Sequence, residues 1–170
     1  MTSSNDSASH WVSSLSLSPH PEGGYFKETY RSSDSIPVGT FGDRFSGSRS
    51  VSTGIFYLLE AGDFSAFHRI RSDEMWHFYA GGALELHILH DGKHQVVRIG
   101  RDVQQGEHLQ FVVPAGAWFA STPVENASYS LLGCTVSPGF DFNDFEMASR
   151  SALIATFPSH GEVITRFTRS

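Results

Sequence analysis

The sequence of 170 residues predicts one all-β domain, an antiparallel sandwich or barrel with short helices near its two ends. Short runs rich in β-branched and aromatic residues follow one another along most of the chain, without helical segments between them. Most of these runs are separated by Gly, Pro, Asp or Asn, which favour turns. Strands repeated at this spacing are typical of sandwiches and barrels.

The single domain of residues 1–170 is expected to have three parts: an N-terminal arm with a short helix (1–20), the barrel (21–140), and a C-terminal helix and tail (141–170). Within the arm, residues 1–9 are expected to fray. A helix over 10–18 must stop near Pro19 and Pro21, because proline lacks the amide proton that a helix needs.

The barrel strands follow the arm. The expected strands cover residues 25–32, 51–60, 65–70, 74–80, 83–90, 94–100, 108–114, 117–121 and 129–136. The polar, Gly-containing segment 33–49 is long enough to cover a site. In 141–157 the apolar period becomes helical, with Asp141 or Asn143 as the cap. One face of that helix is expected to carry Phe145, Met147, Ala148 and Leu153.

Bulk properties restrict the partners. The formal net charge of -6 disfavours a nucleic-acid or anionic-membrane partner. No apolar run reaches membrane-spanning length, and the N-terminus has no leader-like pattern. The one cysteine, Cys134, cannot form an internal disulfide, and a small buried apolar role suits it better than a nucleophilic one. These features predict a cytoplasmic protein.

Two spaced motifs stand out. In residues 62–82, Gly62, His68, Glu74 and Gly81 are spaced as in the first cupin motif. That motif has a second histidine, and this chain has Ile70 at its position. The second motif is degenerate. Gly106, Pro114 and Gly116 are present with two extra residues before the proline, and Phe119 stands where a further histidine would be.

Five longer stretches resemble the uncharacterised cupin family 5, the domain of unknown function 985. These stretches are HPEGGYFKETYRS, STGIFYLLE, FHRIRSDEMWHFYAG, VVPAGAWFA and GCTVSPGFDFNDFEMA, in that order along the chain. The resemblance implies a cupin barrel (a double-stranded β-helix, or RmlC-like jelly roll), a homodimer, and a shape similar to that of sugar-nucleotide epimerases. It implies no established reaction.

Strand alternation predicts which side chains face the interior. If His68 points inward, so does Ile70, and on the next strand Glu74 is inward while His77 is outward. By the same rule His87 is outward, as a solvated or interface histidine. Gln110, with His108, is a further expected inward polar group.

The predicted catalytic pair is His68, as general base or acid, with Glu74 as its partner. The alternatives are a buried ion pair without chemistry, or a metal site. His68 and Glu74 would be two ligands of such a site, whereas transition metals need three or four. No cofactor is therefore expected, and a divalent metal is the less favoured alternative.

Further side chains are predicted to contact a small-molecule ligand. Arg69, with Lys27, could hold an anionic group, and Glu22 stands beside two glycines that permit close backbone approach. Aromatic residues could line the pocket, although core packing explains them equally well. The predicted ligand-binding residues are Glu22, Tyr25, Arg69, Trp76, Phe78, Gln110, Trp118, Phe119 and Asp141.

Three functions fit this pattern. The first is a metal-independent isomerase or epimerase of a sugar-like carbonyl compound. The second is a metal-dependent cupin oxygenase or isomerase with an unrecognised third ligand. The third is a non-catalytic small-molecule-binding protein.

Overall fold

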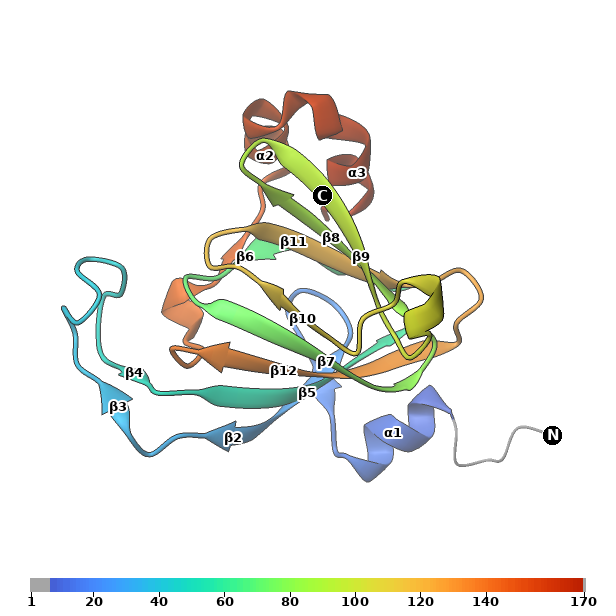
Figure 1. Ribbon diagram of the computed structural model, residues 1–170, viewed down its shortest axis with the longest axis horizontal. Coiled ribbons are helices and arrows are strands. Elements are labelled where there is room, and N and C mark those ends of the chain that lie inside the picture. Colours follow the sequence, from blue (N-terminus) through green and yellow to red (C-terminus); the bar gives the residue numbers. More distant parts are fainter. Residues whose placement is uncertain (1–6, 170) are drawn as a thin grey trace.

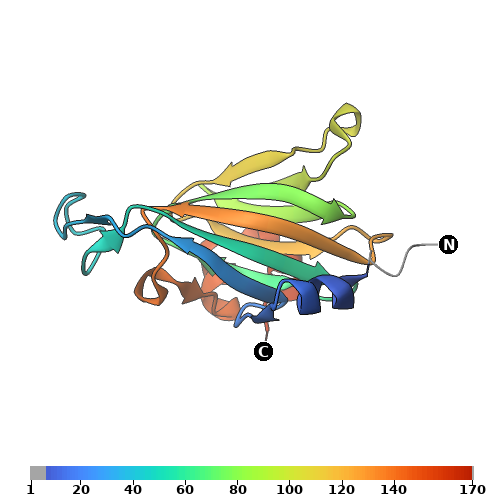
Figure 2. The same cartoon turned by 90° about the horizontal axis from the view of Figure 1, so that it is seen from below.

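The computed structural model describes residues 7–169, which form two facing β-sheets flanked by short helices (Figures 1 and 2). The six-stranded sheet has the order β1 (Ser18–Pro19), β2 (Tyr25–Arg31), β5 (Thr53–Glu60), β12 (Tyr129–Ser137), β7 (Asp73–Gly81), β10 (Gln110–Val113). The five-stranded sheet has the order β13 (Glu146–Met147), β6 (Ser65–Arg69), β11 (Trp118–Pro123), β8 (Leu84–His90), β9 (Lys93–Ile99). The described strands therefore form a jelly-roll sandwich rather than one closed barrel, and the predicted all-β class is confirmed.

The remaining elements are short. Strands β3 (Ser35–Ile36) and β4 (Arg49–Ser50) pair with each other in a hairpin that projects from the sandwich (Figure 1). The helices are α1 (Ala8–Ser14), α2 (Arg150–Thr156) and α3 (Gly161–Arg166), and the 3₁₀ turns are η1 (Val103–Gln105), η2 (Phe142–Asp144) and η3 (Pro158–His160). None of the helices in the described part of the chain has the length and apolarity needed to span a bilayer.

The main core lies between the two sheets, because alternate residues of each strand point inward. Its fully buried side chains include Trp76, Leu86 and Phe119. The inward parity predicted for strands 74–80 and 83–90 is confirmed, since Glu74 and Trp76 share the inner face while His77 donates to Thr135 Oγ1 (2.9 Å) on the outer one.

Helices cover part of the outer face of each sheet. On the five-stranded sheet, Phe67 and Ala120 pack beneath α2 and α3. On the six-stranded sheet, Leu58 and Tyr129 pack beneath α1. His87 is buried in the first of these contacts, against Phe167 at a ring-centroid distance of 4.6 Å. It does point away from the inner core, but its expected exposure to solvent is wrong because the C-terminal helices cover it.

Two predicted helices differ from the observed ones. The first begins at Ala8, where the Ser7 side chain accepts from the His10 amide (3.2 Å), and it ends at Ser14 because Ser16 has a φ of 54°. Of the residues expected to fray, 1–6 lie outside the described part of the chain.

The C-terminal helix begins only at Arg150. The expected helix start at Phe145–Ala148 is wrong, since Glu146 and Met147 pair with Arg69 and His68 as strand β13. Pairing with β6 satisfies the backbone of this segment in place of a helix, and the Ala148 amide donates to Phe67 O (2.8 Å).

Candidate functional site

A cavity of ≈ 70 Å³, open to solvent at its mouth, lies at one end of the sandwich. Because one water needs about 10–15 Å³ of such volume, the space has room for several waters or a small ligand. Its lining comes from strands of both sheets, from the segment before β2 and from the segment 140–145. The lining residues are His20, Glu22, Phe26, Glu28, Thr53, Ile55, His68, Ile70, Glu74, Cys134, Val136, Phe140, Phe142 and Phe145.

His68 lies at the buried end of β6, and both of its ring nitrogens are engaged. Nδ1–H donates to Ala66 O at 2.7 Å, and Nε2 is 3.0 Å from Glu22 Oε2. With a carbonyl on one side and a carboxylate on the other, the ring donates from both nitrogens as imidazolium. Its partner is therefore Glu22 and not Glu74, which corrects the pairing expected from the motif.

Glu22 reaches this buried position because two glycines follow it. Gly23 and Gly24 have φ values of 119° and 71°. A Cβ at Gly23 would lie 2.2 Å from Phe64 O, so only glycine permits this approach. The Glu22 carbonyl also accepts from the Ala66 amide (2.9 Å). These contacts fix the segment against β6 and direct the carboxylate at His68.

The pair shifts both ionisation equilibria. Burial opposes the charged form of His68, but the adjacent Glu22 carboxylate outweighs burial and raises the His68 pKa. Burial likewise opposes ionisation of Glu22, and the His68 charge and hydrogen bond lower its pKa nevertheless. Both directions favour a buried ion pair at neutral pH.

Glu74 lies on β7 and lines the same cavity, without a cation bonded to it among the described residues. Burial raises the pKa of Glu74 to about 7, although the His68 charge opposes that rise. Its carboxyl is therefore close to half ionised at neutral pH. Burial also raises the pKa of the Cys134 thiol well above its ordinary value, so Cys134 stays protonated, in line with its expected role as a small buried residue.

His20 extends the polar wall on the other side of Glu22. Its Nδ1 accepts from the Glu22 amide (3.3 Å) and lies 3.5 Å from Glu22 Oε2. Burial lowers the His20 pKa more than Glu22 raises it. His20 therefore favours the neutral form, and the sequence prediction did not include it.

Phenylalanine rings form the opposite wall. Phe140, Phe142 and Phe145 contact one another at ring-centroid distances of 4.9, 5.9 and 6.2 Å. Phe26 continues the wall through His20 (4.5 Å), and Phe145 also faces His68 (5.3 Å). The sequence contained a signal for Phe26, because neighbouring strand residues point to opposite faces and Phe26 must face the side opposite to Tyr25. No strand pattern marked the other three, because they lie in an irregular segment.

The structure brings several predicted site residues together. His68, Glu74, Glu22 and Ile70 all line the cavity. Phe119, at the position of a missing ligand, is the Cα partner of His68 across the strands, and their rings lie 4.1 Å apart. Phe119 is fully buried and supports the histidine from behind.

Other predicted ligand contacts lie away from this cavity. Trp76 and Phe78 belong to the core between the sheets. Trp118 packs beside the C-terminal helices because Phe119 takes the inward position on β11. Arg69 lies over the Trp118 ring (4.5 Å) and pairs with Glu146 (2.7 Å).

Strand parity also explains the remaining displaced residues. Tyr25 packs on the outer face with α1, and Lys27 is exposed on that strand. Gln110 is exposed and donates to His77 Nδ1 (3.0 Å), so its expected inward orientation is wrong, and His108 is exposed as well. On β10 the inward residues are Phe111, which lies opposite Trp76, and Val113, which lies opposite Glu74. Asp141 caps η2 by accepting from the Asn143 amide (2.9 Å).

The side chains of this site do not fit a tightly held metal ion. Within residues 7–169, no group of three or more His, Cys, Asp or Glu side chains is placed to hold one. The one histidine at a cupin ligand position donates from both nitrogens and so offers no lone pair. Ile70 and Phe119 are apolar at two other such positions.

The jelly-roll sandwich, with its cavity between the sheets at one end, defines the chain as a cupin-fold protein. Solved structures agree. A hypothetical protein from Leishmania major has a TM-score of 0.88 at 36% identity, covering 97% of this chain and 100% of that one. Protein SO0799 from Shewanella oneidensis has a TM-score of 0.86 at 36% identity, covering 96% and 98%.

The chain belongs to the family described as Cupin superfamily (DUF985), whose model matches residues 9–148. A curated relative, the Saccharomyces cerevisiae uncharacterized protein YML079W, is 33% identical over 142 aligned positions, and the match covers 78% of this chain and 71% of that protein. Oxalate decarboxylase from Bacillus subtilis shares only the fold, with a TM-score of 0.53 at 14% identity over 88% of this chain and 36% of that one.

Proposed function

We propose that this cupin is an isomerase or epimerase that moves a proton on a small carbonyl compound without a bound metal. Glu74 is the general base and acid, His68 is the fixed positive charge, and Glu22 is the positioning residue that holds His68. These roles differ from those expected from sequence, where His68 transferred the proton and Glu74 was its partner.

The observation that carries the proposal is that one cavity contains both a carboxyl with no ion-pair partner among residues 7–169 and a histidine held as imidazolium. Glu74 lines the cavity, and His68 is fixed by Ala66 O and Glu22. A carboxylate can take the proton from the carbon next to a carbonyl, leaving the electron pair as an enolate. Both His68 N–H groups are already bonded, so the imidazolium charge stabilises that enolate oxygen through space, and Glu74 returns the proton to carbon.

Solvent deuterium incorporation into candidate carbonyl sugars tests the chemistry. Glu74→Gln keeps the shape but removes the base, so exchange is expected to fall by about 10²-fold or more. In the wild-type protein, exchange should rise as pH increases through about 7, because the ionised form of Glu74 is the base. The surface variant Glu146→Gln is the control. Exchange that persists in Glu74→Gln would contradict the assigned base.

Glu22→Gln tests the positioning role separately. Without the carboxylate, the His68 pKa is expected to fall below its wild-type value, which NMR titration of the imidazole nitrogens measures. A purely structural role for Glu22 would change stability and leave the His68 pKa where it was.

Metal analysis tests the cofactor part of the proposal. Because His68 has no free lone pair, dialysis against EDTA should leave deuterium exchange unchanged. A stoichiometric transition metal in purified protein that disappears in His68→Ala would overturn this part.

A non-catalytic binding protein is the second candidate. The full engagement of both His68 nitrogens favours it, since a satisfied ion pair also serves as a rigid wall. Binding of carbonyl compounds without deuterium exchange across a broad panel would decide for this candidate.

A further inference from the structure

The charge of the cavity wall indicates what the ligand cannot carry. None of the described residues that line the cavity is Lys or Arg. The positive charge of His68 is paired with Glu22 at 3.0 Å, and His20 favours its neutral form. The other ionisable lining groups, Glu28, Glu74 and Cys134, carry no positive charge in either form. Among the described residues, the wall therefore offers no free cationic N–H group that could bind the charged group of an anionic ligand.

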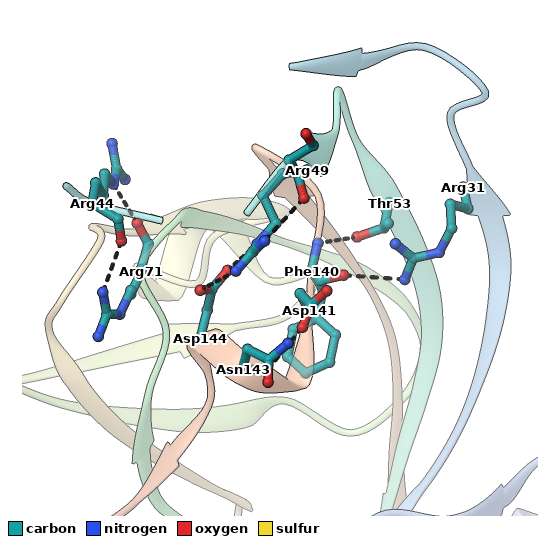
Figure 3. A network of polar contacts seen from close by, with 10 residues as sticks. Arg31, Arg44, Arg49, Thr53, Arg71, Phe140, Asp141, Asn143 and Asp144 are labelled. Atoms are coloured by element: carbon teal, nitrogen blue, oxygen red, sulfur yellow. Dashed lines mark hydrogen bonds and ion pairs between the residues drawn. The ribbon is translucent and has the colours of Figure 1, made fainter. Parts of the chain in front are cut away.

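The arginines near the cavity are occupied by other partners (Figure 3). Arg49 makes a buried two-pronged contact with Asp144 (2.6 and 2.7 Å). Arg31 donates to both oxygens of Glu28 (2.9 and 2.7 Å) and to Phe140 O (3.1 Å). Neither guanidinium group lines the cavity, and their bonds to Phe140 O and Asp144 hold the aromatic segment 140–145 in place.

The aromatic side of the cavity indicates what the ligand can present. Four phenylalanines from β2 and the segment 140–145 contribute ring edges and faces. Such rings attract flat or C–H-rich surfaces and do not stabilise an anion over their negative faces. An anionic ligand would lose its hydration and meet no compensating charge.

We infer that the cavity accepts uncharged carbonyl compounds with a flat or apolar face and rejects those that carry phosphate or carboxylate. This inference rests on the proposed function only in placing the ligand in this cavity. The inferred ligand class also differs from that of enzymes of similar shape that act on sugar nucleotides, because the phosphates of a sugar nucleotide need cations to bind them.

Matched ligand pairs test the inference. Methyl phenylpyruvate is compared with phenylpyruvate, methyl pyruvate with pyruvate, and dihydroxyacetone with its phosphate, using ligand-observed NMR on the full chain. Each neutral member should bind at least about tenfold more tightly than its anion. Equal or tighter binding of the anions would overturn the inference, as would a failure of every neutral member to bind.

A charge variant sharpens the test. Glu28→Gln removes the carboxylate partner of Arg31 at this lining position, so the affinity for anions should rise about tenfold or more and the preference for neutral ligands should narrow. Glu85→Gln is the matched control, because it breaks another exposed pair, Glu85–Arg98 (3.0 Å), on β8 and β9 away from the cavity. An unchanged preference in Glu28→Gln would count against the inference.

The chemistry and the charge preference can fail independently. Binding is measured without turnover, so a retained neutral preference without deuterium exchange contradicts only the proposed proton transfer. Exchange on a phosphorylated or carboxylated compound contradicts only the charge preference.

Discussion

At Glu74, burial on β7 governs the charge of the carboxyl more strongly than the neighbouring His68 does. Glu22 is as deeply buried, yet its pKa moves in the opposite direction because His68 is bonded to it directly. Two carboxyls in one cavity thus have pKa values pushed apart, which is the arrangement typical of acid–base sites.

Glu74→Gln should stabilise the protein at alkaline pH. The folded-state pKa of Glu74 is raised from 4.5 to about 7, so the folded state binds more protons than the unfolded state between these values. Stability from this group is therefore present at low pH and is lost as pH rises through about 7. The variant should gain up to about 3 kcal/mol relative to wild type at pH ~8, as measured by urea unfolding. A gain of the same size at pH ~4 would contradict this origin.

Among the elements, the segment 138–146 closes one wall of the cavity although it has little regular structure. Arg49 from β4 and Asp144 from η2 form the buried ion pair that anchors it (Figure 3), and Phe140 N donates to Thr53 Oγ1 (2.9 Å). The segment 33–49, which the sequence predicted to cover a site, contributes no residue to the cavity lining. It supports the cavity wall indirectly, because its last residue, Arg49, anchors Asp144. It is tied to the sandwich again by Arg44 and Arg71, each of which donates to the other's carbonyl.

Arg49→Ala should destabilise the protein by about 3–5 kcal/mol, because it leaves the buried Asp144 carboxylate without a partner. In this variant, amide hydrogen exchange should become faster in segment 138–146 than in the rest of the chain. Arg69→Ala is the control, since the exposed Arg69–Glu146 pair should be worth less than about 1 kcal/mol. Equal losses in the two variants would show that the Arg49 pair has no special anchoring role.

The C-terminal helices α2 and α3 should loosen in acid. Burial, then the neighbouring His94, lowers the His87 pKa to about 4, with Arg166 adding to this and Glu85 opposing it. His160 lies on the far side of His94, with ring centroids 5.6 Å apart. The stability that neutral His87 contributes is present above the ordinary pKa of 6.5 and is lost as pH falls from 6.5 toward 4.

Hydrogen exchange of α2 and α3 at pH ~7 and ~5 measures this loosening. His87→Leu should remove most of the acid sensitivity, whereas His90→Leu, at an exposed position on the same strand, should keep it. Acid sensitivity that survives in His87→Leu would assign the effect to another group.

For the whole molecule, the homodimer stays a prediction, and the outer face of the six-stranded sheet is where we expect it. Met75, Tyr79 and Val112 expose 37%, 51% and 40% of their surface there. A sheet face with such side chains is a suitable contact for a second copy. Light scattering after gel filtration should give the molar mass of a dimer for the wild-type protein and that of a monomer for Tyr79→Glu. Val103→Glu, at an exposed position on η1, is the control, and a monomeric wild-type protein would contradict the prediction.

Strand positions were predictable because each strand has local signals. The alternation around His68, Glu74 and Leu86 assigned inner and outer faces correctly, since the side-chain period of a strand is two. The same alternation failed for Gln110, because the sequence before Pro114 does not show how this strand is aligned with β7, where Gln110 lies opposite the outward His77. The helix expected at Phe145 failed for a related reason: an apolar period cannot show that an edge strand will capture the segment.

The all-β class, the cupin spacing, and the apolar replacements Ile70 and Phe119 could be read from the sequence, because these depend on local pattern. The pairing of Glu22 with His68 came only from folding, since the two residues are 46 positions apart and meet through a close backbone approach. The contacts by which arginines hold the aromatic wall also came only from folding. Charge pairing depends on distance in space, and the order of residues along the chain does not record that distance.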